Sequence, residues 1–198
     1  MTEADLPRAV LDSCVLYPPG LRNLFMWLAV EELFMPKWTA KIHEEWMENA
    51  LEDDAKKNFP PRLERAKLER TRELMDRHAP RSLVTDYEHW IPTLALPDAD
   101  DRHILAAAIE AGAESIVTFN HRHFPATALA PYGVEAVKPD DFLCALFDEQ
   151  PDSFMSAVNA LLASLKNPPM SVEILCQGYL KLGLTHLVQR IQAHSVSV

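Results

Sequence analysis

Glycine is scarce in this chain of 198 residues, which contains only five. Loops that cradle phosphate groups need closely spaced glycines, and neither such a loop nor a GxSxG nucleophile motif occurs here. The three cysteines, Cys14, Cys144 and Cys176, are odd in number and far apart. We therefore expect buried, reduced thiols in a cytoplasmic protein, rather than a disulfide framework or a zinc site.

Long apolar runs are also missing. No stretch approaches the roughly 20 apolar residues of a membrane span. The N-terminal sequence MTEADLPRAVLDS lacks the basic start and apolar core of a secretory signal. The hydrophobic content of 48% and the charged content of 24% are typical of a soluble globular protein. We expect a cytoplasmic location and no membrane partner.

Basic residues are outnumbered by acidic ones, and the formal net charge of −10 argues against a general nucleic-acid binder. The charge is unevenly distributed, however. Between Lys56 and Arg81, nine Lys and Arg residues stand against four Asp and Glu residues. This segment, here called the basic arm, could guide an RNA backbone, present a solvated face to water or dock onto an acidic partner.

Short apolar segments alternate with helical patterns in the first part of the chain. Strands are predicted in residues 8–13, ending at Asp12, and in residues 82–88, 115–119 and 134–139, with a turn at 14–20. Helices are predicted at 21–34, 40–54, 62–78, 101–111 and 140–150. From Pro151 onward only helices are predicted, at 152–165, 171–182 and 185–194. The pattern predicts an α/β domain with a parallel sheet over residues 1–150, followed by an all-helical C-terminal extension over residues 151–198.

Acidic residues crowd the start of one predicted helix. The stretch LPDADDRHILAAAIEAGAESIVTFN, residues 96–120, places Asp98, Asp100 and Asp101 within four positions. Carboxylates this close repel one another and raise one another's pKa. A helix cap accounts for part of the pattern, and a bound divalent cation would account for the rest.

Further polar candidates stand at predicted strand ends. Asp12 ends the first strand, and Asn120 follows the strand SIVTF. Sites in parallel sheets form beyond the carboxyl ends of strands, and Glu44 or Glu45 of the second helix could complete the set. Oxygen ligands select Mg²⁺ or Mn²⁺, and a carboxylate-bound ion can activate water beside a phosphodiester. Each residue taken alone also has a structural interpretation as a cap, a turn residue or a solvated acid.

Together these segments resemble a PIN domain. VLDSCVL, TAKIHEEW, LPDADDRHILAAAIEAGAESIVTFN and HFP are similar to the branch of VapC-type toxin ribonucleases whose motif reads LPDxDDRHxLAAA, followed by TFNxxDFP. The likeness covers residues 8–147, and the tail NPPMSVEILCQGYLKLGL resembles the helical extension that some members carry. The resemblance implies a PIN-like parallel sheet flanked by helices and RNA cleavage that depends on Mg²⁺ or Mn²⁺. It also implies a cognate antitoxin protein as partner and, commonly, a homodimer.

The resemblance also assigns roles to residues. The implied metal ligands are Asp12, Glu45, Asp98 and Asp101, and the implied catalytic residues are Asp12, Glu45, Asp101 and Asn120. Thr118 and Asn120 match the T-x-N that follows the third strand, which makes Thr118 a candidate for substrate binding. Arg102 and Arg122 flank the acids and are candidates for phosphate contacts, with solvated surface charge as the alternative.

One position departs from the branch. Where TFNxxDFP has its aspartate, this chain has His123. The change removes a carboxylate from the predicted metal site. It could weaken a second metal position, favour Mn²⁺ over Mg²⁺, reduce activity, or be tolerated because that acid touches only outer-shell water. The alternative function is therefore a weak or inactive PIN scaffold that binds RNA or a partner protein.

Overall fold

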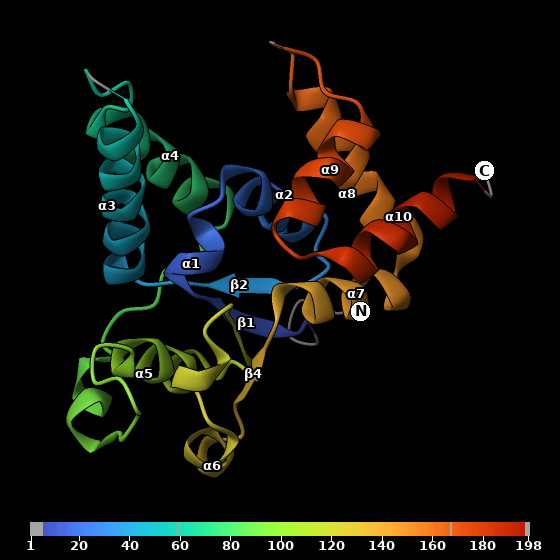
Figure 1. The fold of residues 1–198 in the computed structure, drawn as a ribbon. Helices are drawn as coiled ribbons and strands as arrows, with labels where there is room; N and C mark the ends of the chain where they lie inside the picture. The colour runs from blue at the N-terminus through green and yellow to red at the C-terminus, as the bar shows by residue number, and fades with distance from the viewer. Residues whose placement is uncertain (1–5, 59, 167, 197–198) are drawn as a thin grey trace.

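The computed structural model of the chain describes residues 6–58, 60–166 and 168–196 (Figure 1). Its centre is a parallel sheet of four strands in the order β2-β1-β3-β4. The strands are β1 (Arg8–Leu11), β2 (Met35–Lys37), β3 (Ser115–Val117) and β4 (Glu135–Val137). The predicted α/β class is confirmed. The prediction about a secretory signal concerns in part residues 1–5, which lie outside the described residues.

The two central strands are apolar because helices cover both faces of the sheet. All residues of β3 are buried, as are all residues of β1 except Arg8. Helix α5 (Arg102–Ala111) packs against β1, β2 and β3 on one face, while α1 (Ser13–Leu16) and α2 (Pro19–Val30) lie on the other (Figure 1). The predicted end of α5 at residue 111 is confirmed, and the next residue, Gly112, forms a left-handed cap with a φ of 58°.

Two predicted elements are wrong, and one strand of the structure was not predicted. Residues 82–88 form no strand but contribute one isolated bridge, between Leu83 and Trp38, before the 3₁₀ helix η2 (Glu88–Thr93). The missing strand is β2, which contains Pro36 and lies at the edge of the sheet. Proline lacks an N–H and is tolerated at such an edge. The predicted turn at residues 14–20 contains the single turn of α1 and the start of α2 at Pro19.

Helices α3 (Ala40–Lys57) and α4 (Arg65–His78) form a projecting limb (Figure 1). A polar network ties its base together: Asp76 Oδ1 accepts hydrogen bonds from Trp38 Nε1 at 2.9 Å and from His43 Nε2 at 3.3 Å. Trp46 Nε1 donates to His43 Nδ1 at 2.9 Å. Because Nδ1 is an acceptor, the ring proton of neutral His43 is on Nε2. Burial lowers the pKa of His43 to about 4.

The rest of the chain is mostly helical. After β3 come η3 (His121–His123), α6 (Ala126–Leu129) and η4 (Ala130–Tyr132), and after β4 come α7 (Pro139–Glu149), α8 (Pro151–Ser164), α9 (Val172–Lys181) and α10 (Thr185–Val196). Helix α10 packs on α7, while α8 and α9 pack on α2. The leucine-rich tail therefore packs largely on the protein itself, with buried side chains at Leu161, Leu175, Leu184, Leu187, Val188 and Ile191. The domain boundary at residue 150 stays a prediction.

The described residues also bear on the predictions about membrane spans and cysteines. No helix among them is long and apolar enough to cross a membrane. The three cysteines are free; Cys144 and Cys176 are buried as predicted, whereas Cys14 is only half-buried.

Candidate metal centre

Three segments bring polar side chains to the carboxyl-end edge of the sheet. Asp12 directly follows β1, and its N–H donates to the carbonyl of Val117 at the end of β3. Thr118 and Asn120 follow β3. Helix α5 precedes β3 and runs back along the sheet, so its N-terminus, with the acids before it, lies at the same edge as the strand ends.

Asp12 is buried, and side chains hold its carboxylate. Thr118 Oγ1 donates to Asp12 Oδ2 at 2.6 Å, Cys14 Sγ donates to the same oxygen at 3.1 Å, and Ser13 Oγ donates to Oδ1 at 3.2 Å. The side chain makes no capping bond to the backbone of α1, although Asp12 stands at the N-cap position. Burial, with the neighbouring Asp12, raises the pKa of Cys14 to about 12. The thiol therefore stays protonated as a donor to Asp12.

Thr118 links Asp12 to the turn that follows β3. Its side chain is fully buried, and its Oγ1 accepts a hydrogen bond from the backbone N–H of Asn120 at 2.9 Å. The side chain of Asn120 is exposed. The Thr118 hydroxyl also lies 3.6 Å from Cys14 Sγ. All these contacts are with the protein, and the predicted contact of Thr118 with substrate stays a prediction.

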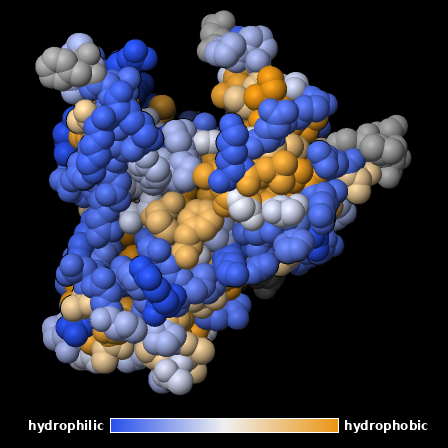
Figure 2. All heavy atoms as spheres, viewed as in Figure 1, coloured by the Kyte–Doolittle hydropathy of each residue, from blue (hydrophilic) through white to orange (hydrophobic). Residues whose placement is uncertain are grey.

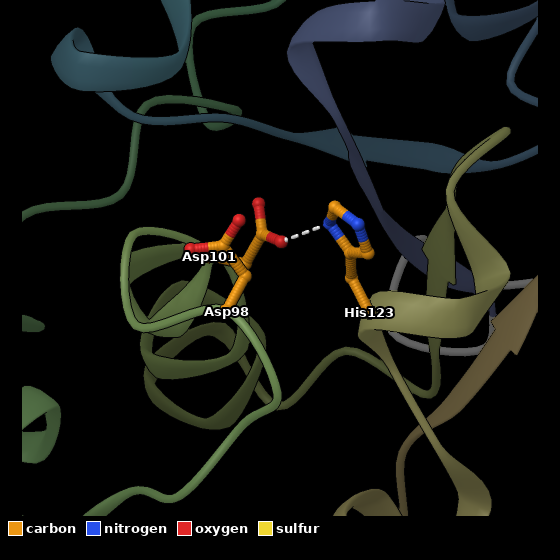
Figure 3. Close-up of side chains that lie close together, drawn as sticks. All are labelled: Asp98, Asp101 and His123. Carbon is orange, nitrogen blue, oxygen red and sulfur yellow. Dashed lines mark hydrogen bonds and ion pairs between the residues drawn. The ribbon is translucent and has the colours of Figure 1, made fainter.

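Asp98, Asp101 and His123, here called the rim cluster, face one another across the edge of the site (Figure 3). One ligand atom from each lies within 4.8 Å of the others, and His123 Nδ1 lies 2.7 Å from Asp101 Oδ2. Burial raises the pKa of Asp101, and the carboxylates of Asp12 and Asp98 raise it further, against the opposite effect of His123. The predicted crowding of negative charge is therefore present, and it includes Asp12. Asp101 occupies the N-cap position of α5 but makes no side-chain cap.

From the sequence, His123 is the loss of an acid, with a preference for Mn²⁺ over Mg²⁺ among its consequences. The structure adds that the imidazole itself occupies the rim. Arg122 Nε donates to His123 Nε2 at 3.3 Å, which assigns the ring proton to Nδ1 and makes Nδ1–H the donor to Asp101. The alignment with the motif could have indicated this place for the ring, since His123 stands where the resembling branch has its last acid.

The two glutamates of α3 have different partners. Glu44 forms an ion pair with Arg65 of α4. Glu45 Oε1 lies 2.9 Å from Nε2 of His103, a buried residue of α5. Of the predicted ligands, Asp98 and Asp101 belong to the rim cluster, whereas Glu45 and Asp12 do not. The ligand roles of all these residues stay predictions.

Arg122 and most of the basic arm have partners in the protein, whereas Arg102 does not have one for its Nε among the described residues. Arg122 is exposed and bonded to His123, and Arg102 has a buried Nε with no hydrogen-bond partner among the described residues. Figure 2 shows a hydrophilic surface over the α3–α4 limb, with hydrophobic residues gathered over the C-terminal helices. Within the basic arm, acids pair with Lys56, Lys57, Arg65, Lys67, Arg70 and Arg72. Much of the positive charge of the arm is thus neutralised locally, and its role in guiding RNA stays a prediction.

A divalent cation fits the rim cluster. Two atoms bound to one Mg²⁺ at about 2.1 Å lie at most about 4.2 Å apart, close to the spacing of 4.8 Å or less found here. A cation would also relieve the carboxylate repulsion that contributes to the raised pKa of Asp101. The carboxylate oxygens and an imidazole nitrogen together form a usable ligand set.

Comparison with known families agrees with this geometry. The family model for the PIN domain matches residues 8–122, which include both Asp12 and the acids before α5. The chain belongs to the PIN domain family. In this PIN protein, a second family model, the VapC50 C-terminal domain, matches residues 139–193. The resemblance that the motifs indicate is therefore confirmed for both parts of the chain.

A curated relative of this PIN protein extends the comparison. A protein of Mycobacterium tuberculosis (strain ATCC 25618 / H37Rv) named "Putative ribonuclease VapC50" is 41% identical over 71 residues. The match covers 36% of this chain and 42% of the relative, and so spans less than half the length of that protein. No solved structure matches the chain at a significant level.

Proposed function

We propose that this protein is a metal-dependent endoribonuclease, a VapC-like toxin that cleaves phosphodiester bonds of RNA. The observation that carries the proposal is the convergence of Asp98 and Asp101 near buried Asp12 at the carboxyl edge of a PIN-domain sheet. Carboxylates gathered at such an edge are costly without a cation. The name of the curated relative, a ribonuclease, supports the same chemistry.

The acids would hold the ion, and their neighbours would hold the acids. Asp12, Asp98 and Asp101, with Glu45 from α3, would bind Mg²⁺ or Mn²⁺. A bound ion would supply a water of lowered pKa and offset negative charge on the phosphate. Thr118 would keep the carboxylate of Asp12 in one orientation through its 2.6 Å hydrogen bond.

The remaining polar residues would contact RNA. The exposed amide of Asn120 would orient a ligand or the scissile phosphate, and Arg102 and Arg122 would contact phosphate oxygens. Arg122 would have to leave His123 to do so. The basic arm would add contacts that depend on charge and not on sequence.

The family membership also supports proposals about partners. A cognate antitoxin protein would neutralise the enzyme, RNA would be its substrate, and a homodimer is the proposed assembly. A toxin that cuts cellular RNA would act in the cytoplasm. The exposed side chains of Ile174 and Leu180 on α9 are apolar surface that a protein partner could cover.

The test is to replace two acids by their amides. Asp12→Asn and Asp101→Asn should each lower metal-dependent cleavage of a labelled RNA by about a hundredfold or more, because each removes charge and a ligand oxygen from the site. Asp100→Asn is the matched control. Asp100 is exposed, lies next to Asp101 and stands outside the rim cluster, so this variant should cleave at the rate of the parent.

The same variants separate loss of function from loss of fold. Relieving carboxylate repulsion should leave the metal-free Asp101→Asn protein at least as stable as the parent in urea unfolding. If either amide variant cuts RNA as fast as the parent, the proposed site is wrong.

A scaffold without activity is the second candidate, favoured by the histidine at position 123. In that case the parent would bind RNA, measured by fluorescence anisotropy, but would not cleave it with either Mg²⁺ or Mn²⁺. Cleavage that EDTA abolishes and either ion restores would exclude the scaffold.

A further inference from the structure

We propose that His123 makes the rim cluster a mixed nitrogen–oxygen site that selects a first-row transition ion over Mg²⁺. The inference rests on the proposed function of the same site and deepens it by specifying the ion. Two carboxylates and one imidazole, from the loop before α5 and from η3, face the same point (Figure 3).

The ligand chemistry gives the preference. Mg²⁺ favours oxygen ligands and gains little from an imidazole, whereas the affinity of nitrogen sites rises along the first transition row from Mn²⁺. An aspartate at position 123 would give a third carboxylate and favour a hard ion. The histidine removes one negative charge and supplies a borderline donor, so the balance shifts towards Mn²⁺ and the later ions.

A proton has to move before Nδ1 can bind an ion. In the described geometry Nδ1–H donates to Asp101, and Nε2 accepts from Arg122 Nε at 3.3 Å. Coordination uses the Nδ1 lone pair, so this proton leaves through water and another is taken up at Nε2, and the ring stays neutral. Nε2–H and Arg122 N–H would then face each other as two donors, and the contact must break. Arg122 is exposed and can turn to solvent.

Arg122 therefore competes with the ion for the tautomer of His123. Only an ion that gains from nitrogen coordination can offset this rearrangement, which sharpens the discrimination against Mg²⁺. The arginine that is released becomes available for the phosphate contact proposed above.

The experiment measures binding of Mn²⁺ and Mg²⁺ to the full chain after removal of metal with EDTA, by calorimetry and without RNA. The wild type should bind Mn²⁺ more tightly. His123→Asp should reduce the ratio of the two affinities by about tenfold or more. His89→Asp makes the same change at an exposed position outside the rim cluster, and should leave the ratio unchanged.

Two further measurements keep the inference testable if His123→Asp folds poorly. Pulsed electron paramagnetic resonance of bound Mn²⁺ should show coupling to a nitrogen nucleus in the wild type. Arg122→Ala should strengthen Mn²⁺ binding severalfold while changing Mg²⁺ binding less.

The outcomes are distinguishable from those of the proposed function. Absence of nitrogen coupling in the wild type, or an unchanged affinity ratio in folded His123→Asp, would overturn the inference, even if RNA is cleaved. Selective Mn²⁺ binding without RNA cleavage would overturn the ribonuclease and leave the ion selectivity standing.

Discussion

Asp12 and Asp140 are both buried, at 3% and 8% exposure, but the carboxylate of Asp140 has backbone donors besides the ring of His186, whereas the described donors to Asp12 are side chains. Asp140 lies in the first turn of α7 and accepts from the backbone N–H groups of His186 at 3.1 Å and Leu187 at 2.9 Å. These groups belong to the first turn of α10, so Asp140 joins two helices and meets a favourable helix dipole. Asp12 accepts from side chains, with Thr118 as its closest donor.

The difference shows that burial of an aspartate does not by itself identify a functional site. The charge of Asp140 is matched by a helix N-terminus. Asp12 lies beside a second carboxylate, Asp101, whose pKa it helps to raise. Asp76, with donors from Trp38 and His43, belongs with Asp140 as a structural acid. Replacing the structural acids Asp76 and Asp140 should mainly lower stability, whereas replacing Asp12 or Asp101 should mainly lower metal binding and activity.

The largest stability effect should come from the Asp76 network, through its buried histidine. The pKa of His43 is about 4 in the folded protein and about 6.5 in an unfolded chain. Between these values the unfolded state binds more protons, so stability is complete above pH 6.5 and falls as the pH drops towards 4. We expect a loss of up to about 3 kcal/mol from this residue, measured by urea unfolding at pH 7.5 and pH 4.

A matched variant isolates the histidine from carboxyl groups that titrate in the same range. His43→Gln retains a side-chain N–H for Asp76 but does not titrate. The free energy of unfolding that this variant loses between pH 7.5 and pH 4 should therefore be smaller than the loss in the parent, by most of the amount attributed to His43. Equal pH dependence in the two proteins would mean that His43 is not the group responsible.

The next effect should come from the acid between α7 and α10. Asp140→Ala leaves two N–H groups of α10 without their acceptor and should lower the free energy of unfolding by about 2 kcal/mol. Mn²⁺ binding and RNA cleavage should be unchanged at temperatures where the variant is folded. This is the reverse of Asp101→Asn, which should lose activity and keep stability. Loss of Mn²⁺ binding in folded Asp140→Ala would break the comparison between the two acids.

The sequence predicts elements whose signals are local. The buried strands β1 and β3 and the end of α5 at Ala111, before the left-handed Gly112, all follow from neighbouring residues. Strand β2 depends on pairing with β1, which outweighs the signal of Pro36. The strand predicted at 82–88 fails where Asp86 adopts a φ of 63°, which ends the extended backbone.

The candidate site divides in the same way. The motifs predict Asp12, Asp98 and Asp101 as site residues, because the ends of strands and the starts of helices can be predicted from local sequence. The hydrogen-bond partners of these acids cannot be predicted in this way, since they depend on tertiary contacts. Thr118 lies 106 positions from Asp12 along the chain. Likewise, nothing near Asp140 indicates that it meets α10, 46 positions further on.

The smallest effect concerns Glu45, the predicted ligand outside the rim cluster. His103 is buried on α5, its Nε2 lies 2.9 Å from Glu45 Oε1, and its Nδ1 has no hydrogen-bond partner among the described residues. Such an unpaired nitrogen is unfavourable, which suggests that the ring is kept for its contact with Glu45. His103→Leu should weaken Mn²⁺ binding by about tenfold, as loss of a residue that orients a ligand does.

His103→Gln distinguishes positioning of Glu45 from simple packing. A glutamine can donate an N–H to Glu45 but fills the site less well than the ring, so it should restore Mn²⁺ affinity without restoring all of the stability. If His103 only fills space, the order should be reversed, and the Mn²⁺ affinity of His103→Leu should be closer to that of the parent than the affinity of His103→Gln. If both variants bind Mn²⁺ with the affinity of the parent, the contact with His103 does not orient Glu45 as a metal ligand. It would then belong with Asp76 and Asp140 among the structural acids.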